Sequence, residues 1–232
     1  VWHGLSAPYR PLFDWLTAGD PKPRSNLGGA FMPAMLANPI DRCELETLEP
    51  AHFRAEWKWD GIRVQVASSW GIKRLYSRAG EDVSGAFPDI IEAIDFEGVF
   101  DGELLVRREE AVAPFNDLQQ RLNRKTVTPK MLKEHPAHVR LEAWMAEKPR
   151  SRFDVSPLVV FSDWAHLATL RESMREDGIE GLMLKRGDSP YVAGRPKGPW
   201  FKWKRDPMLA DCVLMYAQRG HGKRSSFYSD FT

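Results

Sequence analysis

Residues 56–63 read Glu-Trp-Lys-Trp-Asp-Gly-Ile-Arg. The prediction of the fold of the whole chain starts from this stretch. Side chains alternate between the two faces of an extended strand, so Lys58 shares a face with Glu56 and Asp60. The two tryptophans face the other way and form an aromatic underside. Gly61 then permits a turn or a close backbone approach that a side chain would block. The stretch predicts a strand that holds a lysine between two carboxylates; an amphipathic strand with merely solvated charges is the alternative.

Lys58-Trp59-Asp60-Gly61-Ile62-Arg63 resembles the Lys-x-Asp-Gly-x-Arg motif of the covalent nucleotidyltransferases, which comprise DNA ligases, RNA ligases and mRNA capping enzymes. The resemblance implies that Lys58 attacks the α-phosphorus of a nucleotide and then carries AMP or GMP. It also assigns Glu56 and Arg63 to nucleotide binding. An amine attacks phosphorus only without its proton, so burial and neighbouring cations must favour the neutral lysine.

The composition is that of a globular protein with almost no net charge. The chain has 232 residues, 43% of them hydrophobic, with 33 Lys plus Arg against 32 Asp plus Glu. This length allows one large or two small domains, and any nucleic-acid contact must come from local basic patches. The two distant cysteines, Cys43 and Cys212, match neither a disulfide framework nor a zinc site and indicate a reduced compartment.

No apolar run approaches the roughly 18 residues of a membrane span, so we expect no membrane association. The chain begins Val-Trp-His-Gly-Leu, without an initiator Met or a signal-peptide pattern, and we expect an internal fragment of a longer protein. The expected location is the cytoplasm, in association with a bacterial nucleoid, or the nucleus if the source is eukaryotic.

The residues before the lysine motif predict a helix, a linker and a lead-in to the core. Apolar residues at helical spacing predict a helix over residues 8–16, and Gly-Asp-Pro-Lys-Pro at 19–23 ends it. Residues 1–28 resemble the tail of the helical DNA-binding domain of many ligases; a simple packing helix is the alternative. The apolar run at 31–37 resembles the segment that leads into the ligase core, which we expect over residues 29–205.

A second motif follows the lysine after a predicted hairpin. Residues 62–67 and 72–76 alternate apolar and polar side chains across a short turn. Tyr-Ser-Arg-Ala-Gly at 76–80, followed by a Phe-Pro helix start, resembles a ligase element whose arginine contacts the nucleotide ribose or the DNA 5′-phosphate. The resemblance assigns Arg78 to both ligands.

The buried run at residues 98–106 places Asp101 and Glu103 on one face. Carboxylates inside an apolar strand need a partner, and a buried salt bridge is one solution. The run resembles the family's Asp-Gly-Glu motif, which assigns Glu103 to the ribose or to a divalent metal.

Residues 164–177 predict a helix with Gly178 as its C-cap, followed by the buried strand Glu-Gly-Leu-Met-Leu-Lys at 180–185. The strand resembles the family's Glu-Gly-hydrophobic-x-x-Lys motif. This assigns Glu180 to the divalent metal and Lys185 to phosphate; charged strand ends that merely reach solvent are the alternative.

Residues 195–205 contain five basic and no acidic residues. In a strand, Phe201 and Trp203 face the core while Lys202 and Lys204 face the other way. Trp200-x-Lys202-x-Lys204 resembles the last core motif and assigns both lysines to the nucleotide. A nucleic-acid stacking surface is the alternative, but the alternation favours core packing.

Basic residues outside these motifs predict DNA contacts. Residues 120–133 hold five basic and no acidic residues, which form either a phosphate-facing surface or a solvated one. Residues 206–232 predict a hinge at Asp-Pro, a strand over 212–217 and a loop over 218–226, at the position where an OB-fold begins in the ligases. The residues expected at DNA are Arg78, Arg121, Arg124, Lys125, Arg219 and Lys223.

The family pattern breaks at Leu141 and Glu142. Ligases carry here a strand with Phe-Asp whose aromatic ring stacks on the adenine, but residues 139–144 pass from the start of such a strand directly into a helical segment. Phe161 suits a different strand and does not take this role. Either residues are deleted, which leaves the adenine pocket without one wall, or the sequence omits them; omission is preferred.

Five motifs lie in family order between Glu56 and Lys204. On them the chain is identified as a member of the ATP-dependent DNA ligases, with an adenylation core. The implied fold is α/β (α+β), an ATP-grasp-like nucleotidyltransferase fold of mostly antiparallel sheets with flanking helices, followed by the start of an OB-fold. The implied cofactors are ATP and Mg²⁺, the partner is nicked double-stranded DNA, and the protein is expected to be a monomer.

Three rival functions remain open. RNA ligase and capping guanylyltransferase share the lysine chemistry, and a nucleic-acid-binding module could keep the fold without the reaction. The ligase-like Ser77-Arg78 element argues against the first two, and the complete set of charged motif residues argues against the third. NAD is disfavoured as the donor because no nicotinamide-binding module is recognisable.

Overall fold

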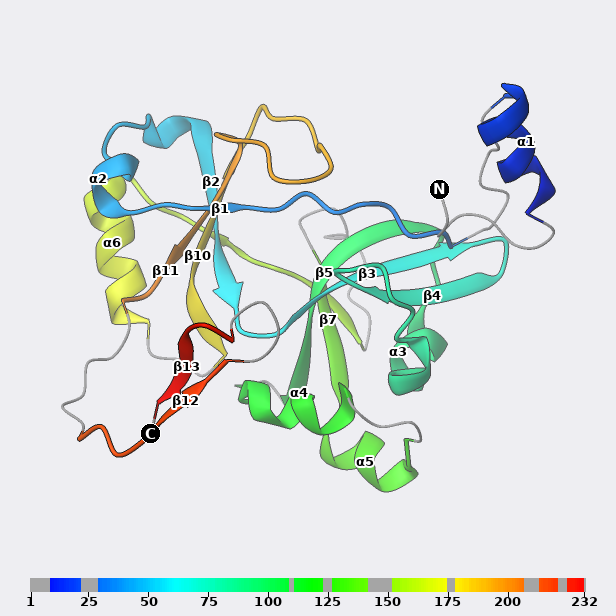
Figure 1. Ribbon diagram of the computed structural model, residues 1–232. Coiled ribbons are helices and arrows are strands. Elements are labelled where there is room, and N and C mark those ends of the chain that lie inside the picture. Colours follow the sequence, from blue (N-terminus) through cyan, green and yellow to red (C-terminus); the bar gives the residue numbers. More distant parts are fainter. Residues whose placement is uncertain are drawn as a thin grey trace.

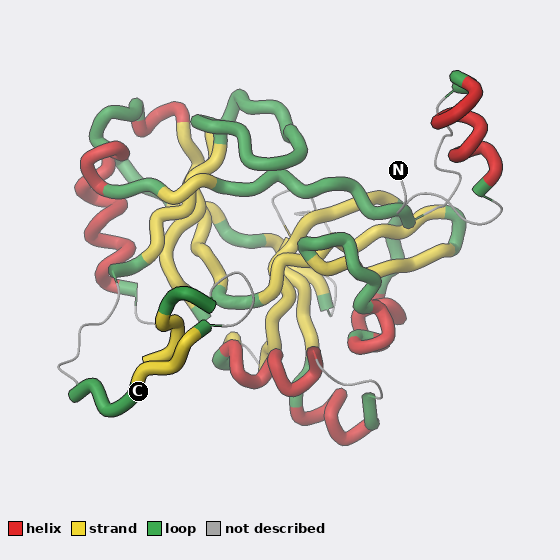
Figure 2. The backbone as a smooth tube through the Cα atoms, in the orientation of Figure 1, coloured by secondary structure: helices red, strands yellow, loops and turns green. Residues whose placement is uncertain are grey.

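A computed structural model describes residues 9–21, 29–108, 111–122, 127–141, 152–174, 178–206, 213–220 and 225–231. Two β-sheets with helices on their outer sides form the body of these residues (Figures 1 and 2). Ahead of them lies α1 (Arg10–Ala18), which ends at Gly19 in the left-handed conformation. A small third sheet pairs β12 (Ala217–Arg219) with β13 (Tyr228–Phe231).

The first sheet has the strand order β1-β11-β10-β2-β9. Its strands are β1 (Asn38–Pro39), β11 (Trp200–Lys204), β10 (Ile179–Arg186), β2 (Phe53–Trp59) and β9 (Leu158–Val159). All neighbours are antiparallel except β1 and β11. Two helices, α2 (Arg42–Leu45) and α6 (Trp164–Ser173), cover one face (Figure 1), where Leu45 and Leu167 pack against Leu182.

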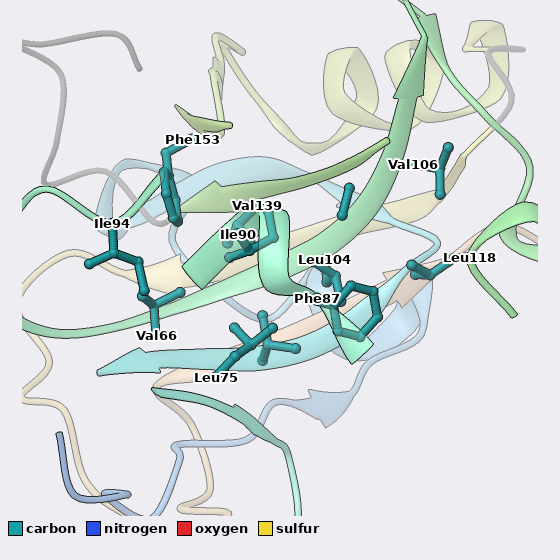
Figure 3. Close-up of a cluster of buried hydrophobic side chains, with 12 residues drawn as sticks. Val66, Leu75, Phe87, Ile90, Ile94, Leu104, Val106, Leu118, Val139 and Phe153 are labelled. Atoms are coloured by element: carbon teal, nitrogen blue, oxygen red, sulfur yellow. The ribbon is translucent and has the colours of Figure 1, made fainter. Parts of the chain in front are cut away.

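The second sheet has the strand order β4-β3-β5-β7-β8, with β6 paired to β5. Its strands are β4 (Ile72–Ser77), β3 (Ile62–Ser69), β5 (Gly98–Arg108), β7 (Ala137–Leu141), β8 (Phe153–Val155) and β6 (Ala111–Val112). Only β7 and β8 run parallel. The helices α3 (Pro88–Ala93), α4 (Phe115–Leu122) and α5 (Pro129–Glu134) lie on one side of it (Figure 1). Figure 3 shows its core, in which Phe87 and Ile90 pack on Val66, Leu104 and Val139.

The chain passes from the first sheet to the second within the lysine motif. It leaves β2 at Trp59, turns at Asp60 and Gly61, and enters β3 at Ile62. A Cβ at Gly61 would lie 2.4 Å from the carbonyl oxygen of Leu104 in β5, far inside van der Waals contact. The glycine is therefore required because the turn passes directly against β5, and the turn carries the chain from β2 in the first sheet to β3 in the second.

The predicted fold class is confirmed: the structure is α+β, and its sheets are mostly antiparallel. The predicted N-terminal helix, the hairpin of β3 and β4, and the strands over residues 98–106, 180–185 and 200–204 are also present. Of the helices in the described ranges, none combines the length and apolar character needed to span a bilayer.

Two local predictions are wrong. The helix predicted over residues 164–177 ends at Ser173 with Met174 as its C-cap, so Gly178 does not cap it. Gly178 instead has a φ of 83° just before β10, and its carbonyl accepts a hydrogen bond from the Asp60 amide at 2.7 Å. Of the strand predicted over residues 212–217, the positions 213–216 have no regular structure, and β12 begins only at Ala217.

The misplaced strand has a physical reason. The side chains of Val213 and Met215 are 84% and 81% exposed, and residues 213–216 pair with no strand in the described part of the chain. An apolar run predicts a strand only where a sheet covers it. The loop predicted over residues 218–226 is shortened accordingly, because Gln218 and Arg219 lie in β12. Pro207, Cys212 and the peptide bond after Leu141 fall outside the described residues.

Candidate active site

A cavity of about 440 Å³ lies where the two sheets meet. β2, β10 and β11 contribute its wall from the first sheet, and β3, β5 and β7 contribute from the second. The cavity brings together seven of the residues that the sequence assigned to nucleotide or metal, namely Lys58, Arg63, Arg78, Glu103, Glu180, Lys202 and Lys204. Motifs that are up to 146 positions apart in the sequence therefore share one site.

Glu180 lies between two of the motif lysines. The Lys58 ammonium donates a short hydrogen bond to Oε1, and Lys204 Nζ lies 2.7 Å from Oε2. Burial raises the pKa of the Glu180 carboxyl, but the hydrogen bonds and charges of Lys204 and Lys58 outweigh it and hold that pKa below its usual range. Glu180 is thus an anion at neutral pH and fixes the position of the lysine nitrogen.

The strand register explains how Glu180 reaches both lysines. Gly181 lies opposite Lys58 of β2 on one side and opposite Lys204 of β11 on the other. The pairing with β2 shifts between Ile179 and Gly181, and a Cβ at Gly181 would lie 2.4 Å from the Trp203 carbonyl oxygen. The glycine of the Glu-Gly motif therefore allows β11 to approach at this point.

The cavity carries a surplus of positive charge. Burial lowers the pKa of Lys202, and the neighbouring cations Arg195, Lys204, Lys58 and Arg78 lower it further. Such mutual repulsion is relieved when an anion enters, because the anion neutralises several cations at once. The electrostatics of the cavity therefore favour a ligand with several negative charges, such as a triphosphate.

A network around Asp101 orients Arg63 at the second sheet's side of the cavity. Arg63 Nη2 donates to Asp101 Oδ2 at 3.1 Å, and Gln65 Nε2 donates to Oδ1 at 3.0 Å. The Tyr191 hydroxyl also donates to Asp101 and accepts a hydrogen bond from the Met35 amide at 2.8 Å. Burial and the Asp101 hydrogen bond raise the pKa of Tyr191 to about 12, so its hydroxyl stays a donor. The loop before β11 is thereby joined to the second sheet.

If Lys58 carries a nucleotide as its motif predicts, replacing Tyr191 with phenylalanine is expected to lower the rate of nucleotide attachment about tenfold, because Arg63 loses part of its support. The loss of one hydrogen bond of this kind should cost about 1 kcal/mol of unfolding free energy. The control is Tyr76→Phe, which removes a phenol hydrogen bond to the Gly29 carbonyl outside the cavity. Equal rates in the two variants would mean that Tyr191 acts only on stability.

Two residues predicted at the nucleotide bind each other instead. Lys185 Nζ lies 3.0 and 2.9 Å from the two carboxylate oxygens of Glu56, and neither residue lines the cavity. Their side chains are only 13% and 8% exposed, so each charge needs the other as a partner. Lys185 also lies 4.9 Å above the ring of Trp200, which does line the cavity. The structure thus gives the pair a role in supporting a cavity wall.

The predicted DNA contact at Arg121 is wrong. Its side chain is fully buried and holds both carboxylate oxygens of Asp89, at 3.0 and 2.5 Å, as well as the carbonyl oxygens of Ala86 and His135. The guanidinium also lies 4.6 Å from the ring centroid of Phe87. A buried side chain with these partners cannot reach DNA phosphates. Its charge instead neutralises Asp89 at the core of the second sheet.

Replacing Arg121 with alanine should lower the free energy of unfolding by about 3–5 kcal/mol, because it leaves Asp89 as a buried carboxylate without its main partner. Chemical denaturation measures this loss. The control is Lys130→Ala, since Lys130 is 79% exposed and, among the residues that the structure describes, forms an ion pair only with Glu134 on the same helix. A loss below about 0.5 kcal/mol is expected there. A mild effect of Arg121→Ala would contradict the structural role.

The other predicted DNA contacts are only partly located. Arg219 is exposed on β12 with its guanidinium 5.8 Å from the Tyr228 ring, and Arg78 lines the cavity. Arg124, Lys125 and Lys223 lie outside the described residues. Of the residues predicted to contact DNA, the structure therefore places Arg219 at the surface and Arg78 in the cavity wall.

Several cavity residues were not predicted as site residues. Met35, Met183 and Trp200 give it apolar walls, and Arg140 and Arg195 add cations. Arg195 carried a signal, since it begins the basic run at residues 195–205. Arg140 carried none, and neither did Tyr191, which is outside the cavity lining and acts through Asp101. Single residues of common types gain a role only through their neighbours in space.

Comparison with known proteins agrees with this geometry. The family model described as ATP dependent DNA ligase domain matches residues 34–141. A probable DNA ligase of Koribacter versatilis is 30% identical over 245 aligned positions, which cover 85% of this chain and 42% of the relative. These matches make the chain similar to the ATP-dependent DNA ligases. The chain spans about two fifths of the length of the curated relatives it matches.

Solved ligase structures share the fold. A mycobacterial DNA ligase D complexed with ATP and MES is 25% identical, with a TM-score of 0.54 over 74% of this chain and 60% of that one. A Lig E DNA ligase, from a study of DNA binding with a minimal scaffold, is 18% identical, with a TM-score of 0.60 over 87% and 79% of the two chains. The second likeness concerns the fold alone.

The ligase comparisons also bear on the break in the pattern. The family model ends at Leu141, where the sequence departs from the ligase motifs. The 245 positions aligned with the Koribacter versatilis relative exceed the 232 residues of this chain, so that ligase has residues with no counterpart here. Such extra residues in the relative are expected whether this protein has lost the segment or the sequence omits it. The preference for omission stays a prediction.

Proposed function

We propose that this chain is the adenylation core of an ATP-dependent DNA ligase that seals nicks through a lysyl-AMP intermediate on Lys58. The main support is the pairing of Lys58 with Glu180 inside a cation-lined cavity between the two sheets. We further propose that residues 1–28 are the tail of a helical DNA-binding domain, that 29–205 form the core, and that 206–232 begin an OB-fold. The protein would work as a monomer.

The proposed first step is the attack of the neutral Lys58 amine on the α-phosphorus of ATP. The ammonium first gives one proton to water; as the nitrogen–phosphorus bond forms, the bond to the bridging oxygen of the β-phosphate breaks, the nitrogen gives a second proton to water, and pyrophosphate leaves. The cations Lys202, Lys204 and Arg195 would neutralise the charge on the phosphates, and Arg63 would hold the nucleotide on the opposite wall. Catalysis in such a site consists mostly of positioning and charge neutralisation.

Two further steps would complete the sealing of a nick. AMP passes from the lysine to a DNA 5′-phosphate, which regenerates the amine and forms a pyrophosphate-type linkage. The neighbouring 3′-hydroxyl then attacks that 5′-phosphate and releases AMP. Arg78 at the cavity and Arg219 at the surface are proposed to hold the DNA phosphates, which predicts binding that weakens as salt rises.

The cavity fits a divalent metal that is held mainly by substrate. Glu103 and Glu180 both line it, and the lowered pKa of Glu180 keeps its carboxylate ionised. Within the described residues, no group of three or more acidic, His or Cys side chains forms a complete metal cage. Mg²⁺ often needs only one or two carboxylates besides phosphates and waters, and when bound it would neutralise phosphate charge.

The deciding experiment offers the protein labelled ATP, GTP or NAD in the presence of magnesium. A covalent, acid-labile label from ATP alone supports the proposal, and a label from GTP alone would point to a capping guanylyltransferase. A nick-sealing assay with DNA and RNA substrates then separates the two kinds of ligase. Absence of label from all three donors would contradict the reaction itself.

A further inference from the structure

Arg140 occupies a position in the cavity that the motifs do not explain. It lies on β7 opposite Glu103 of β5, and its side chain lines the cavity although only 12% of that side chain is exposed. Because it is largely buried, the Arg140 side chain is held in one orientation more firmly than an exposed arginine would be. The small exposed part therefore defines what the side chain can offer to a ligand.

Asp154 occupies the hydrogen-bonding edge of the Arg140 guanidinium. Nε and Nη2 donate to the two carboxylate oxygens at 2.9 and 2.7 Å, which is the bidentate geometry that arginine uses to bind carboxylate or phosphate. Burial opposes ionisation of Asp154, but His138 and Arg140 hold its pKa far below the usual range. The Nε/Nη2 edge, one of the two edges through which arginine binds a phosphate, is therefore taken.

Trp59 covers one face of the same guanidinium. The Arg140 Cζ atom lies 4.1 Å from the indole centroid, and the indole is itself buried and donates from Nε1 to the Ser156 hydroxyl at 3.2 Å. With its Nε/Nη2 edge on Asp154 and one face on Trp59, the guanidinium presents its opposite planar face and its Nη1 end to a ligand. Flat, weakly hydrated guanidinium faces stack well on aromatic rings.

We propose that the stacked pair of Arg140 and Trp59 is the platform on which the base of the bound nucleotide stacks. The inference rests on the proposed function and adds the contact for the base, in which a guanidinium plane takes the role of an aromatic ring. The other cavity cations, Lys202 and Arg195, remain for the phosphates. Arginine planes stack on nucleobases in other nucleic-acid-binding proteins, so the chemistry is available.

The test compares ATP with inorganic tripolyphosphate, which has the charge but no base, by isothermal titration calorimetry. Arg140→Lys keeps the charge and can still reach Asp154, but it loses the planar face; Arg140→Ala loses both. Both variants are expected to bind ATP about tenfold more weakly, the size of one base stack, while their tripolyphosphate affinity stays within about twofold of the wild type. Retained tripolyphosphate binding also shows that the cavity is folded.

Arg107→Lys is the matched control, because Arg107 lies 3.6 Å from the same Asp154 and does not line the cavity. It should leave both affinities unchanged. The proposal is overturned if Arg140→Lys binds ATP like the wild type, or if the Arg140 variants lose tripolyphosphate as strongly as ATP. If the wild type takes no AMP label from ATP, the proposed function itself is wrong. If the wild type is labelled normally and the Arg140 variants bind ATP with unchanged affinity, only the proposed base platform is wrong.

Discussion

Lys58→Ala is expected to lower covalent labelling by ATP at least about a thousandfold, because no other amine replaces a missing nucleophile. The fold should survive, since the lysine side chain lines a cavity and belongs to no core cluster of the described residues. Lys58→Arg should fail as well, because a guanidinium stays protonated and cannot attack phosphorus. Gel detection of the labelled protein measures the effect.

The control for Lys58 is Lys204→Ala, which removes the second lysine bound to Glu180 and leaves the nucleophile in place. Labelling should then fall but remain measurable, since only charge neutralisation is weakened. An acid-labile label that persists in Lys58→Ala would show that another residue carries AMP.

Gly181→Ala is expected to lower the free energy of unfolding by about 3–5 kcal/mol, as much as Arg121→Ala. The new Cβ would lie 2.4 Å from the Trp203 carbonyl oxygen and 2.7 Å from the Lys204 Cα, at a backbone φ of 150°. Both contacts are backbone atoms, so β10 and β11 would have to separate. Urea denaturation measures the loss, and labelling should fall with it because Lys204 moves away.

Gly198→Ala separates the two causes of that loss. Gly198 also has a positive φ, 98°, but a Cβ there meets nothing within 4 Å. Only the backbone conformation is penalised, at about 1 kcal/mol. If the two variants lost equal stability, the close approach of β11 would have no energetic weight.

The sequence was sufficient for the parts of the site that follow from strand alternation. Lys202 and Lys204 share one face of β11 while Trp203 is buried on the other, and Lys58 lines the cavity as its position in the lysine motif predicted. These residues are close in the sequence, so a single local geometry determines their directions. The motif resemblance then indicated that the separate strands meet.

The sequence was insufficient where a charge had two possible partners. Arg121 stands in a basic run and was read as a phosphate contact, yet it is buried on Asp89, which is 32 positions away. Glu56 and Lys185 lie 129 positions apart and neutralise each other. Whether a charge meets solvent, a ligand or an opposite charge depends on long-range packing, which periodicity does not encode.

The long sequence separation between β2 and the strands it pairs with has a consequence for the order in which the cavity is completed during protein synthesis. Lys58 and its partner Glu180 are 122 positions apart, and Lys202 and Lys204 follow later still. A ribosome makes the chain from the N-terminus, so the lysine leaves the exit tunnel well before the strands that build its cavity. An unfinished chain therefore carries the proposed nucleophile without the cations that line the cavity. On the proposed mechanism, Lys58 takes up AMP only after β11 has been made and has joined the first sheet.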